Sequence, residues 1–239
     1  MTRDVVAIHQ PNYLPWLGWF AKALQADRMI LLDDVQFSRG SYTHRVEVKT
    51  PTGVTRLSVP VRRGSVGFQS IADVQISYDR RWAAQHSGTL QQSYGKSPGW
   101  RRFGPEITAL LNASEPSLCR LNHALLDVLR RGLAIDTPFV SSASWGARET
   151  GGSAAIALLC ERAGAAVYLS GSGGQSYNVE DDFTERGVEL RYTRFEHPTY
   201  DQLHGEFAPG LSALDLLFNA PDEAPQILRS GIKDSEPPH

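Results

Sequence analysis

A histidine and three hydrogen-bonding side chains follow the first apolar run of the sequence. His9, Gln10, Asn12 and Tyr13 lie within one short loop that two prolines stiffen. A neutral imidazole at this position could act as a general base or hydrogen-bond a phosphate. The simpler alternative is a histidine that only satisfies loop carbonyls. We predict that His9 is catalytic and that the other three side chains bind the substrate.

Two consecutive carboxylates follow the next apolar run. Asp33 and Asp34 precede Gln36, and adjacent side chains on an extended chain point to opposite faces. At most one carboxylate can therefore share a pocket with His9, where it would orient the imidazole or hold a substrate amine. The other would cap a turn, and Asx-turn chemistry alone is the alternative for both. Both aspartates are candidate catalytic residues, and Gln36 is a candidate substrate ligand.

These aspartates do not predict a metal site. Two adjacent carboxylates without a third ligand at a defined spacing do not specify an ion. We therefore expect no metal and no other cofactor.

A glycine-rich turn follows a later apolar run, in the stretch YLSGSGGQSY at residues 168–177. Glycines let the backbone approach a ligand closely, and successive N–H groups can form an anion-binding nest. The spacing fits neither G-x-G-x-x-G nor a P-loop. A flexible turn is the alternative to a phosphate, carboxylate or sugar contact. The candidate ligands here are Ser170, Gly171, Gly173, Gly174 and Tyr177.

A fourth polar group follows the last predicted strand. His197, Tyr200 and His204 combine imidazole and aromatic rings, which suits a polar organic substrate such as a sugar. We predict that His197 is catalytic and that the other two bind the substrate. Arg45 is a candidate clamp for a phosphate or carboxylate, although a surface arginine is the commoner outcome.

The elements before these groups decide whether they meet. Residues 5–9 and 29–32 read as short buried strands joined by a helix over residues 16–24, with Trp16 and Phe20 on its packed face. The apolar runs are continuous, as in parallel strands covered on both faces. Ligands of an open parallel sheet bind beyond the carboxyl ends of its strands. The histidine loop and the paired aspartates should therefore share one rim.

The rest of the chain continues this α/β pattern. The sequence predicts a hairpin from residues 45–48 and 54–59, a loop at 63–67 and a half-exposed strand over 71–76. The middle third is helical, at residues 80–92, 101–111 and 118–133. The further expected elements are strands at 139–141, 166–169 and 188–193, a helix at 153–163, and an apolar segment at 211–218.

These elements predict an α/β fold with a mostly parallel, Rossmann-like sheet. The sheet opens with a βαβ unit, and the chain carries an inserted β-hairpin and a helical subregion at about residues 80–135. We expect one domain over residues 1–220 and a loose, proline-rich tail over 221–239.

The composition of the chain disfavours some classes of binding partner. The chain has 239 residues, 41% hydrophobic and 21% charged, with a net charge of −2, which disfavours nucleic acid as a partner. Cys119 and Cys160 lie in apolar helical surroundings without a C-x-x-C or a His-rich neighbour, so we expect buried free thiols in a reducing compartment and no structural zinc. No signal-peptide pattern or membrane-length apolar run is found, so we expect a cytoplasmic protein that does not bind a membrane. From the polar groups described above, we expect the partner to be a small molecule that carries a phosphate or a carboxylate.

Four stretches together resemble the WbqC-like protein family: IHQPNYLPWLGWF, DDVQFSRGSYTHRVEVKT, YLSGSGGQSY and FEHPTYDQLHGEFAPGLSALDLLFN. The resemblance spans roughly residues 5–220 and implies a biosynthetic role on a sugar nucleotide or amine-bearing metabolite, in O-antigen or secondary-metabolite pathways. The motif residues that it carries over are His9, Gln10, Pro11, Tyr13, Pro15, Gly18, Asp33, Asp34, Gln36, Arg45, Ser170, Gly171, Tyr177, His197, Pro198, Tyr200, Ser212, Asp215 and Asn219.

The opening also resembles, at the level of the fold, the nucleotidylyl-transferase group. That group has a His-x-Gly-His at the helix start, whereas this chain has Pro15-Trp-Leu-Gly-Trp19. The resemblance therefore supports the fold more than the chemistry.

Our hypothesis is an enzyme that transfers an acyl or aminoacyl group to an amine or hydroxyl of a sugar nucleotide or similar metabolite. His9 is the base, the glycine turn and Arg45 hold an anionic group, and His197 with Tyr177 completes the pocket. The alternatives are ATP-dependent adenylation or ligation, and a non-catalytic binding partner of a pathway enzyme.

Overall fold

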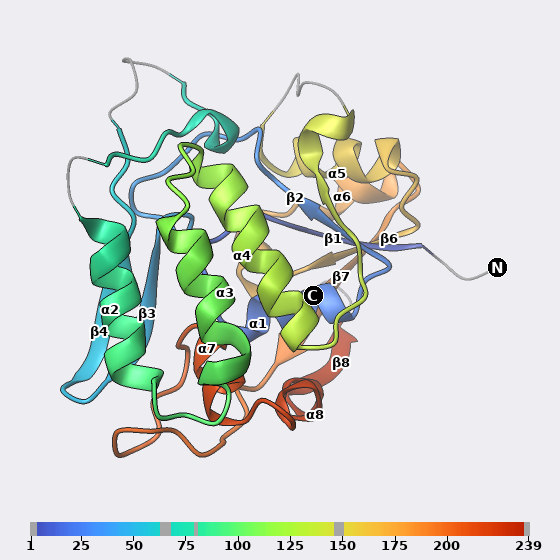
Figure 1. Ribbon diagram of the computed structural model, residues 1–239. Helices are drawn as coiled ribbons and strands as arrows, with labels where there is room; N and C mark the ends of the chain where they lie inside the picture. The colour runs from blue at the N-terminus through green and yellow to red at the C-terminus, as the bar shows by residue number, and fades with distance from the viewer. Residues whose placement is uncertain (1–3, 63–67, 79–80, 146–150, 237–239) are drawn as a thin grey trace.

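A six-stranded sheet forms the centre of the computed structural model, which describes residues 4–62, 68–78, 81–145 and 151–236 (Figure 1). The strand order is β5-β2-β1-β6-β7-β8, and every neighbouring pair is parallel except β7 and β8. Counted along the sheet strands only, this is the order 3-2-1-4-5-6 of a doubly wound fold. The predicted mostly parallel α/β sheet is confirmed. The strands are β1 (Val5–His9), β2 (Arg28–Leu31), β5 (Phe139–Ser141), β6 (Val167–Ser170), β7 (Glu189–Phe195) and β8 (Ile232–Glu236).

Helices cover both faces of this sheet. Ala7 of β1 and Leu31 of β2 belong to a large core with α1 (Leu17–Leu24), α4 (Leu118–Gly132), α7 (Ala213–Asn219) and α8 (Ala224–Ser230). Ile8 and Ile30 point to the other face, where α5 (Gly152–Arg162) and α6 (Glu180–Thr184) form a smaller core. Alternate residues of each strand are thus buried against different helices, which explains why the apolar runs are continuous.

The hairpin and the middle helices form a lobe beside the sheet (Figure 1). Strands β3 (Arg45–Thr50) and β4 (Gly53–Ser58) pair antiparallel, and Gly53 takes the positive φ of +113° that the tight turn requires. Helices α2 (Trp82–Tyr94) and α3 (Trp100–Asn112) pack beside this hairpin and α4. The predicted hairpin and helical middle section are both present.

The strand predicted over residues 71–76 is instead a 3₁₀-helix, η1 (Ile71–Asp73), followed by isolated bridges. The Ser70 hydroxyl accepts a hydrogen bond from the Asp73 backbone N–H and donates to its carboxylate at 2.6 Å. This local capping competes with the extended conformation that the alternating pattern favours. The loop predicted at residues 63–67 lies outside the described residues.

The segment after Pro221, expected to be a loose tail, contains α8 and β8. Ala224 and Leu228, one helical turn apart, are fully buried in the larger core. Strand β8 then pairs with the edge of the sheet at β7, where unpaired backbone groups are available. Burial and strand pairing together order this segment.

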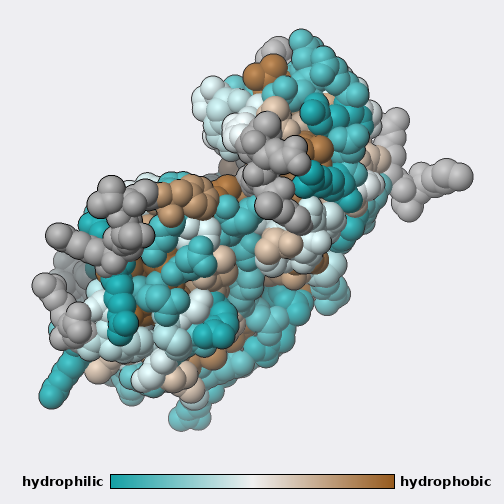
Figure 2. All heavy atoms as spheres, turned by 90° about the horizontal axis from the view of Figure 1, so that it is seen from above, coloured by the Kyte–Doolittle hydropathy of each residue, from teal (hydrophilic) through white to brown (hydrophobic). Residues whose placement is uncertain are grey.

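Seen from above in Figure 2, the surface is mainly hydrophilic, and its hydrophobic residues form small separate groups. Within the described ranges, every helix is too short or too polar to cross a membrane.

Candidate functional site

A crevice opens where the strand order reverses, between β1 and β6. His9 is the last residue of β1 and Ser170 is the last residue of β6. Two cavities of about 370 and 300 Å³ lie at these strand ends and share His9, Lys22, Gly171 and Gly173 in their walls. We treat them as one site, called the crevice. Its position is the one at which doubly wound folds bind ligands.

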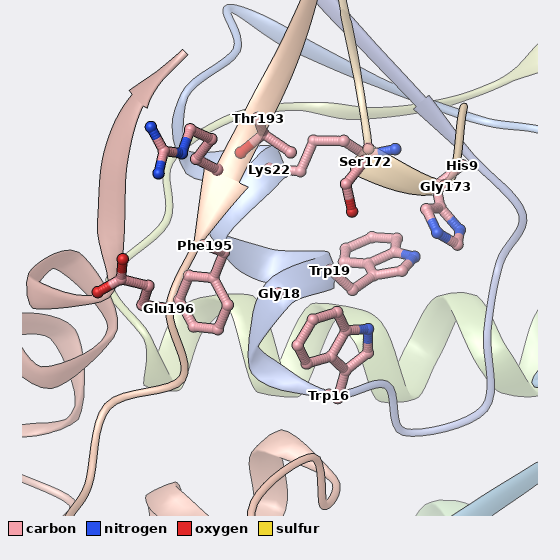
Figure 3. Close-up of a pocket in the computed structure, with 12 residues that line it drawn as sticks. His9, Trp16, Gly18, Trp19, Lys22, Ser172, Gly173, Thr193, Phe195 and Glu196 are labelled. Atoms are coloured by element: carbon pink, nitrogen blue, oxygen red, sulfur yellow. The ribbon is translucent and has the colours of Figure 1, made fainter. Parts of the chain in front are cut away.

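Lys22 lies in the wall of the crevice, although it belongs to none of the four polar groups predicted from the sequence (Figure 3). It belongs to α1 and is only 4% exposed, and its Nζ donates a hydrogen bond to the Ile8 carbonyl oxygen at 2.7 Å. Burial lowers the pKa of Lys22 to about 7. The sequence does indicate that Lys22 is buried, because a short helix that is apolar on all sides must bury its single lysine as well.

His9 is held as a neutral imidazole. Its Nδ1 lies 3.2 Å from the Gln10 carbonyl oxygen, which can only accept, so Nδ1 carries the proton and Nε2 keeps its lone pair. Burial, and secondarily the charge of Lys22, lower the pKa of His9 to about 3. Its ring packs 5.9 Å from the Trp19 ring. His9 therefore presents a hydrogen-bond acceptor at physiological pH.

The glycine turn does not form the predicted nest. Residues Ser172–Ser176 form a short 3₁₀-helix, η3, and the three glycines of the turn are not among the described glycines with positive φ. Gly171 and Gly173 face open space, whereas a Cβ on Gly174 would lie 2.1 Å from the Ser170 hydroxyl. The first two glycines keep the crevice wall open, and the third allows close packing.

Seven of the predicted site residues come together in the crevice. They are His9, Gln10, Ser170, Gly171, Gly173, Gly174 and Tyr177. Trp16, expected on the packed face of its helix, is 42% exposed and lines the crevice instead. Its ring contacts Phe195 edge-on at 5.7 Å, so the crevice has one aromatic wall.

A second cavity of about 350 Å³ contains Asn12, Tyr13 and Arg45 and shares Trp16 with the crevice. The Tyr13 hydroxyl is 2.9 Å from His86 Nδ1, and burial raises the pKa of this tyrosine. Arg45 donates to the Gly40 carbonyl oxygen. Tyr13 and Arg45 thus have hydrogen-bond partners within the protein, and they lie in a cavity separate from His9.

The paired aspartates are not among the described residues that line the crevice. The Ser142 hydroxyl lies 3.0 Å from Asp33 Oδ1 and 2.6 Å from Asp34 Oδ1. Leu32, just before them, does line the crevice, while Asp33 lies beside α4. Alternation along the chain therefore directs Asp33 away from His9. Gln36 forms loop hydrogen bonds, including one from the Gln69 backbone N–H.

The polar group after β7, formed by His197, Tyr200 and His204, lies outside both the crevice and the second cavity. The Tyr200 hydroxyl donates to the buried Asp215 carboxylate of α7 at 3.0 Å. His204 Nε2 lies 2.6 Å from the Ser93 carbonyl oxygen of α2. His197 Nδ1 lies 2.9 Å from the Pro198 carbonyl oxygen. The loop after β7 thus packs Tyr200 against α7 and His204 against α2, and neither the two histidines nor the tyrosine is in the described crevice wall.

The strand order defines a doubly wound α/β protein with a crevice at the topological switch point, the position where such folds bind ligands. A family model described as the WbqC-like protein family matches residues 10–227. The chain belongs to this family. It is 32% identical over 226 residues to a Mycobacterium tuberculosis protein named "Uncharacterized protein Rv1507c", covering 94% of this chain and 97% of that protein. No solved structure matches the chain.

Proposed function

We propose that this protein binds a phosphate-bearing metabolite in the crevice and transfers an acyl or aminoacyl group to its amine or hydroxyl. The metabolite is a sugar nucleotide or a related compound, as family membership suggests. The observation that carries the proposal is the pair formed by buried Lys22 and neutral His9 in one cavity wall.

Lys22 favours an anionic ligand. A buried ammonium group is costly unless an opposite charge accompanies it, and within the described part of the chain Lys22 forms no ion pair, only its bond to Ile8. A phosphate in the crevice would supply that charge and raise the pKa of Lys22 again. Binding energy from the phosphate would then hold the acceptor group in place for reaction.

His9 supports proton transfer. In the proposed step, the acceptor amine or hydroxyl attacks the carbonyl carbon of an activated acyl donor, and His9 Nε2 takes the proton that the acceptor loses. The leaving group departs with the electron pair of the broken acyl bond. An anionic ligand beside His9 raises the pKa of the imidazole and makes it a better base.

Adenylation of a carboxylate is the second candidate function, favoured by the same lysine, since an ammonium group suits the phosphates of ATP. A substrate carboxylate would attack the α-phosphate and release pyrophosphate. His9 is the one histidine in the described crevice wall, so the imidazole pair of the nucleotidylyl-transferase group has no counterpart among the described residues.

The test is a ligand and turnover screen of the full chain. Sugar nucleotides are first ranked by calorimetry against wild type, Lys22→Met and Lys96→Met, which removes an exposed lysine as a control. The ligands that bind are then incubated with an acyl thioester, or with ATP and a carboxylic acid, and products are identified by mass spectrometry. We expect an acylated sugar nucleotide. Pyrophosphate release would favour adenylation, and tight binding without any product would contradict both enzymatic functions.

A further inference from the structure

Three side chains of metal-binding type meet between the end of β2 and helix α4. Asp33 follows β2, whereas Cys119 and His123 lie one turn apart on α4. Cys119 Sγ is 3.8 Å from Asp33 Oδ2 and 3.5 Å from His123 Nε2, and the last two atoms are 3.9 Å apart. The three ligand atoms therefore form a nearly equilateral triangle.

The size of this triangle matches one face of a zinc coordination tetrahedron. Zinc bonds of about 2.3 Å to sulfur and about 2.0–2.2 Å to nitrogen and oxygen give distances of about 3.4–3.6 Å between neighbouring ligands. The separation of 3.5 Å between Cys119 and His123 lies in this range, and the other two, 3.8 and 3.9 Å, exceed it by a few tenths of an ångström. We propose that Asp33, Cys119 and His123 form a zinc-binding site.

The donor types select the ion. A thiolate and an imidazole suit zinc and other late divalent transition metals, whereas calcium and magnesium require oxygen ligands. Burial, and secondarily the Asp33 carboxylate, raise the pKa of Cys119 to about 12. When zinc binds, it replaces the proton of the thiol, and the proton leaves to solvent.

The surroundings are those of a built site. Ser142, which belongs to η2 (Ser142–Trp145), fixes Asp33: its hydroxyl lies 3.0 Å from Asp33 Oδ1 and 3.2 Å from the Asp33 backbone nitrogen. Such outer contacts orient the ligands of metal sites. The side chains of Asp33 and Cys119 are buried, but that of His123 is 34% exposed. The ion enters past this histidine, and three protein ligands leave the fourth position to water.

The position of the site suggests its effect on the protein. Leu32, next to Asp33, lines the crevice, and its backbone N–H donates to the His9 carbonyl oxygen at 2.8 Å. Zinc would therefore tie α4 to the strand ends that carry the crevice. The proposal of this site does not depend on the proposed function, because the ligands lie outside the crevice.

The test uses chelator-treated, full-length protein titrated with zinc and, separately, with cobalt. We expect one zinc per chain and a rise in melting temperature. Cobalt should give a thiolate-to-metal charge-transfer band and the visible absorption of a tetrahedral site. Cys119→Ala and His123→Gln should weaken zinc binding about tenfold or more, and Cys119→Ala should abolish the charge-transfer band. Cys160→Ala removes the other buried thiol, which lies in α5, and should bind zinc as wild type does.

The outcomes separate the proposal from a purely structural cluster. Wild-type protein that takes up no zinc, or a cobalt spectrum without a charge-transfer band, would overturn it. Zinc affinity unchanged in His123→Gln would overturn it as well, and this variant alters a partly exposed side chain, so its fold can be checked by circular dichroism. If Cys119→Ala does not fold, the wild-type cobalt spectrum and His123→Gln decide the question.

Discussion

The Nζ atom of Lys22 lies 2.7 Å from the carbonyl oxygen of Ile8, the residue that precedes His9. This bond ties the first helix to the carboxyl end of the first strand and holds the lysine in the crevice wall beside the imidazole. The buried cation and the neutral ring are thereby fixed by backbone, so a ligand would meet a rigid pair of groups.

The affinity for a sugar nucleotide should fall as pH rises above 7. The anion binds the ammonium form of Lys22, whose pKa in the free protein is about 7, and the pyrophosphate of the ligand does not titrate in this range. Calorimetry between pH 7 and 9 should show weakening by up to about tenfold per pH unit. Lys22→Met should bind weakly at every pH, and an equally steep profile in that variant would refute this role.

The stability difference between Lys22→Met and wild type should depend on pH. The pKa of Lys22 falls from 10.5 when unfolded to about 7 when folded, so the unfolded chain binds more protons between these values. The wild-type free energy of unfolding therefore rises with pH, by up to about 1.4 kcal/mol per unit, whereas the methionine makes no such contribution. In urea unfolding, the free energy of unfolding of wild type minus that of the variant should be larger at pH 9 than at pH 7 by about 1–3 kcal/mol. A constant difference would mean that the lysine titrates normally in the folded protein.

Replacing His9 with Asn should lower turnover of the substrate by roughly 10²- to 10⁴-fold, the usual contribution of a general base. The pKa of His9 is about 3 in the free protein, so kcat/KM should show no acid limb near pH 6.5 from this residue. His44→Asn, outside the crevice wall, serves as the control. Full activity in His9→Asn would remove the base from the proposal.

Asp215→Ala should destabilise the protein without any effect on zinc. The buried carboxylate accepts hydrogen bonds from the hydroxyls of Tyr94 at 2.8 Å and Tyr200 at 3.0 Å. The alanine leaves two buried donors unsatisfied, at a cost of about 2–4 kcal/mol in the free energy of unfolding. Tyr200→Phe removes only one of these donors, while Gln202 Nε2 keeps its bond to the Ala208 carbonyl oxygen, and should cost about 1 kcal/mol. Urea denaturation of the two variants measures both values, and equal losses would contradict the shared-acceptor arrangement.

Two glycines should respond differently to alanine. A Cβ on Gly99 would lie 2.0 Å from the Leu217 backbone oxygen, which cannot move freely, whereas on Gly18 it would meet the end of the exposed Trp16 ring at 2.3 Å. We expect Gly99→Ala to lose at least about 2 kcal/mol of stability. Gly18→Ala should keep its melting temperature but bind sugar nucleotides less tightly, because the ring moves in the crevice wall. A Gly18→Ala variant with wild-type affinity would show that Trp16 does not shape the site.

Most of the local elements can be read from the chain alone, apart from the segment at residues 71–76 and the elements after Pro221. Continuous apolar runs mark β1, β2 and β6 as buried parallel strands, and this places His9 and Ser170 at carboxyl ends. The hairpin and the long middle helices follow from turn residues and periodicity in the same way. These features depend on interactions between residues close together in the chain, so they can be predicted from a single sequence.

Which strand ends meet depends on the packing of the whole chain. Strands β1 and β6 are neighbours although more than 150 residues separate them, and this crossover creates the crevice that joins His9 to the glycine turn. The packing of the helices also buries Lys22, brings Asp33 to Cys119 and His123, and places His197, Tyr200 and His204 outside the crevice wall. Such contacts arise from the packing of helices on a twisted sheet, where the free energy of burying whole faces, and not any local pattern, selects the partners.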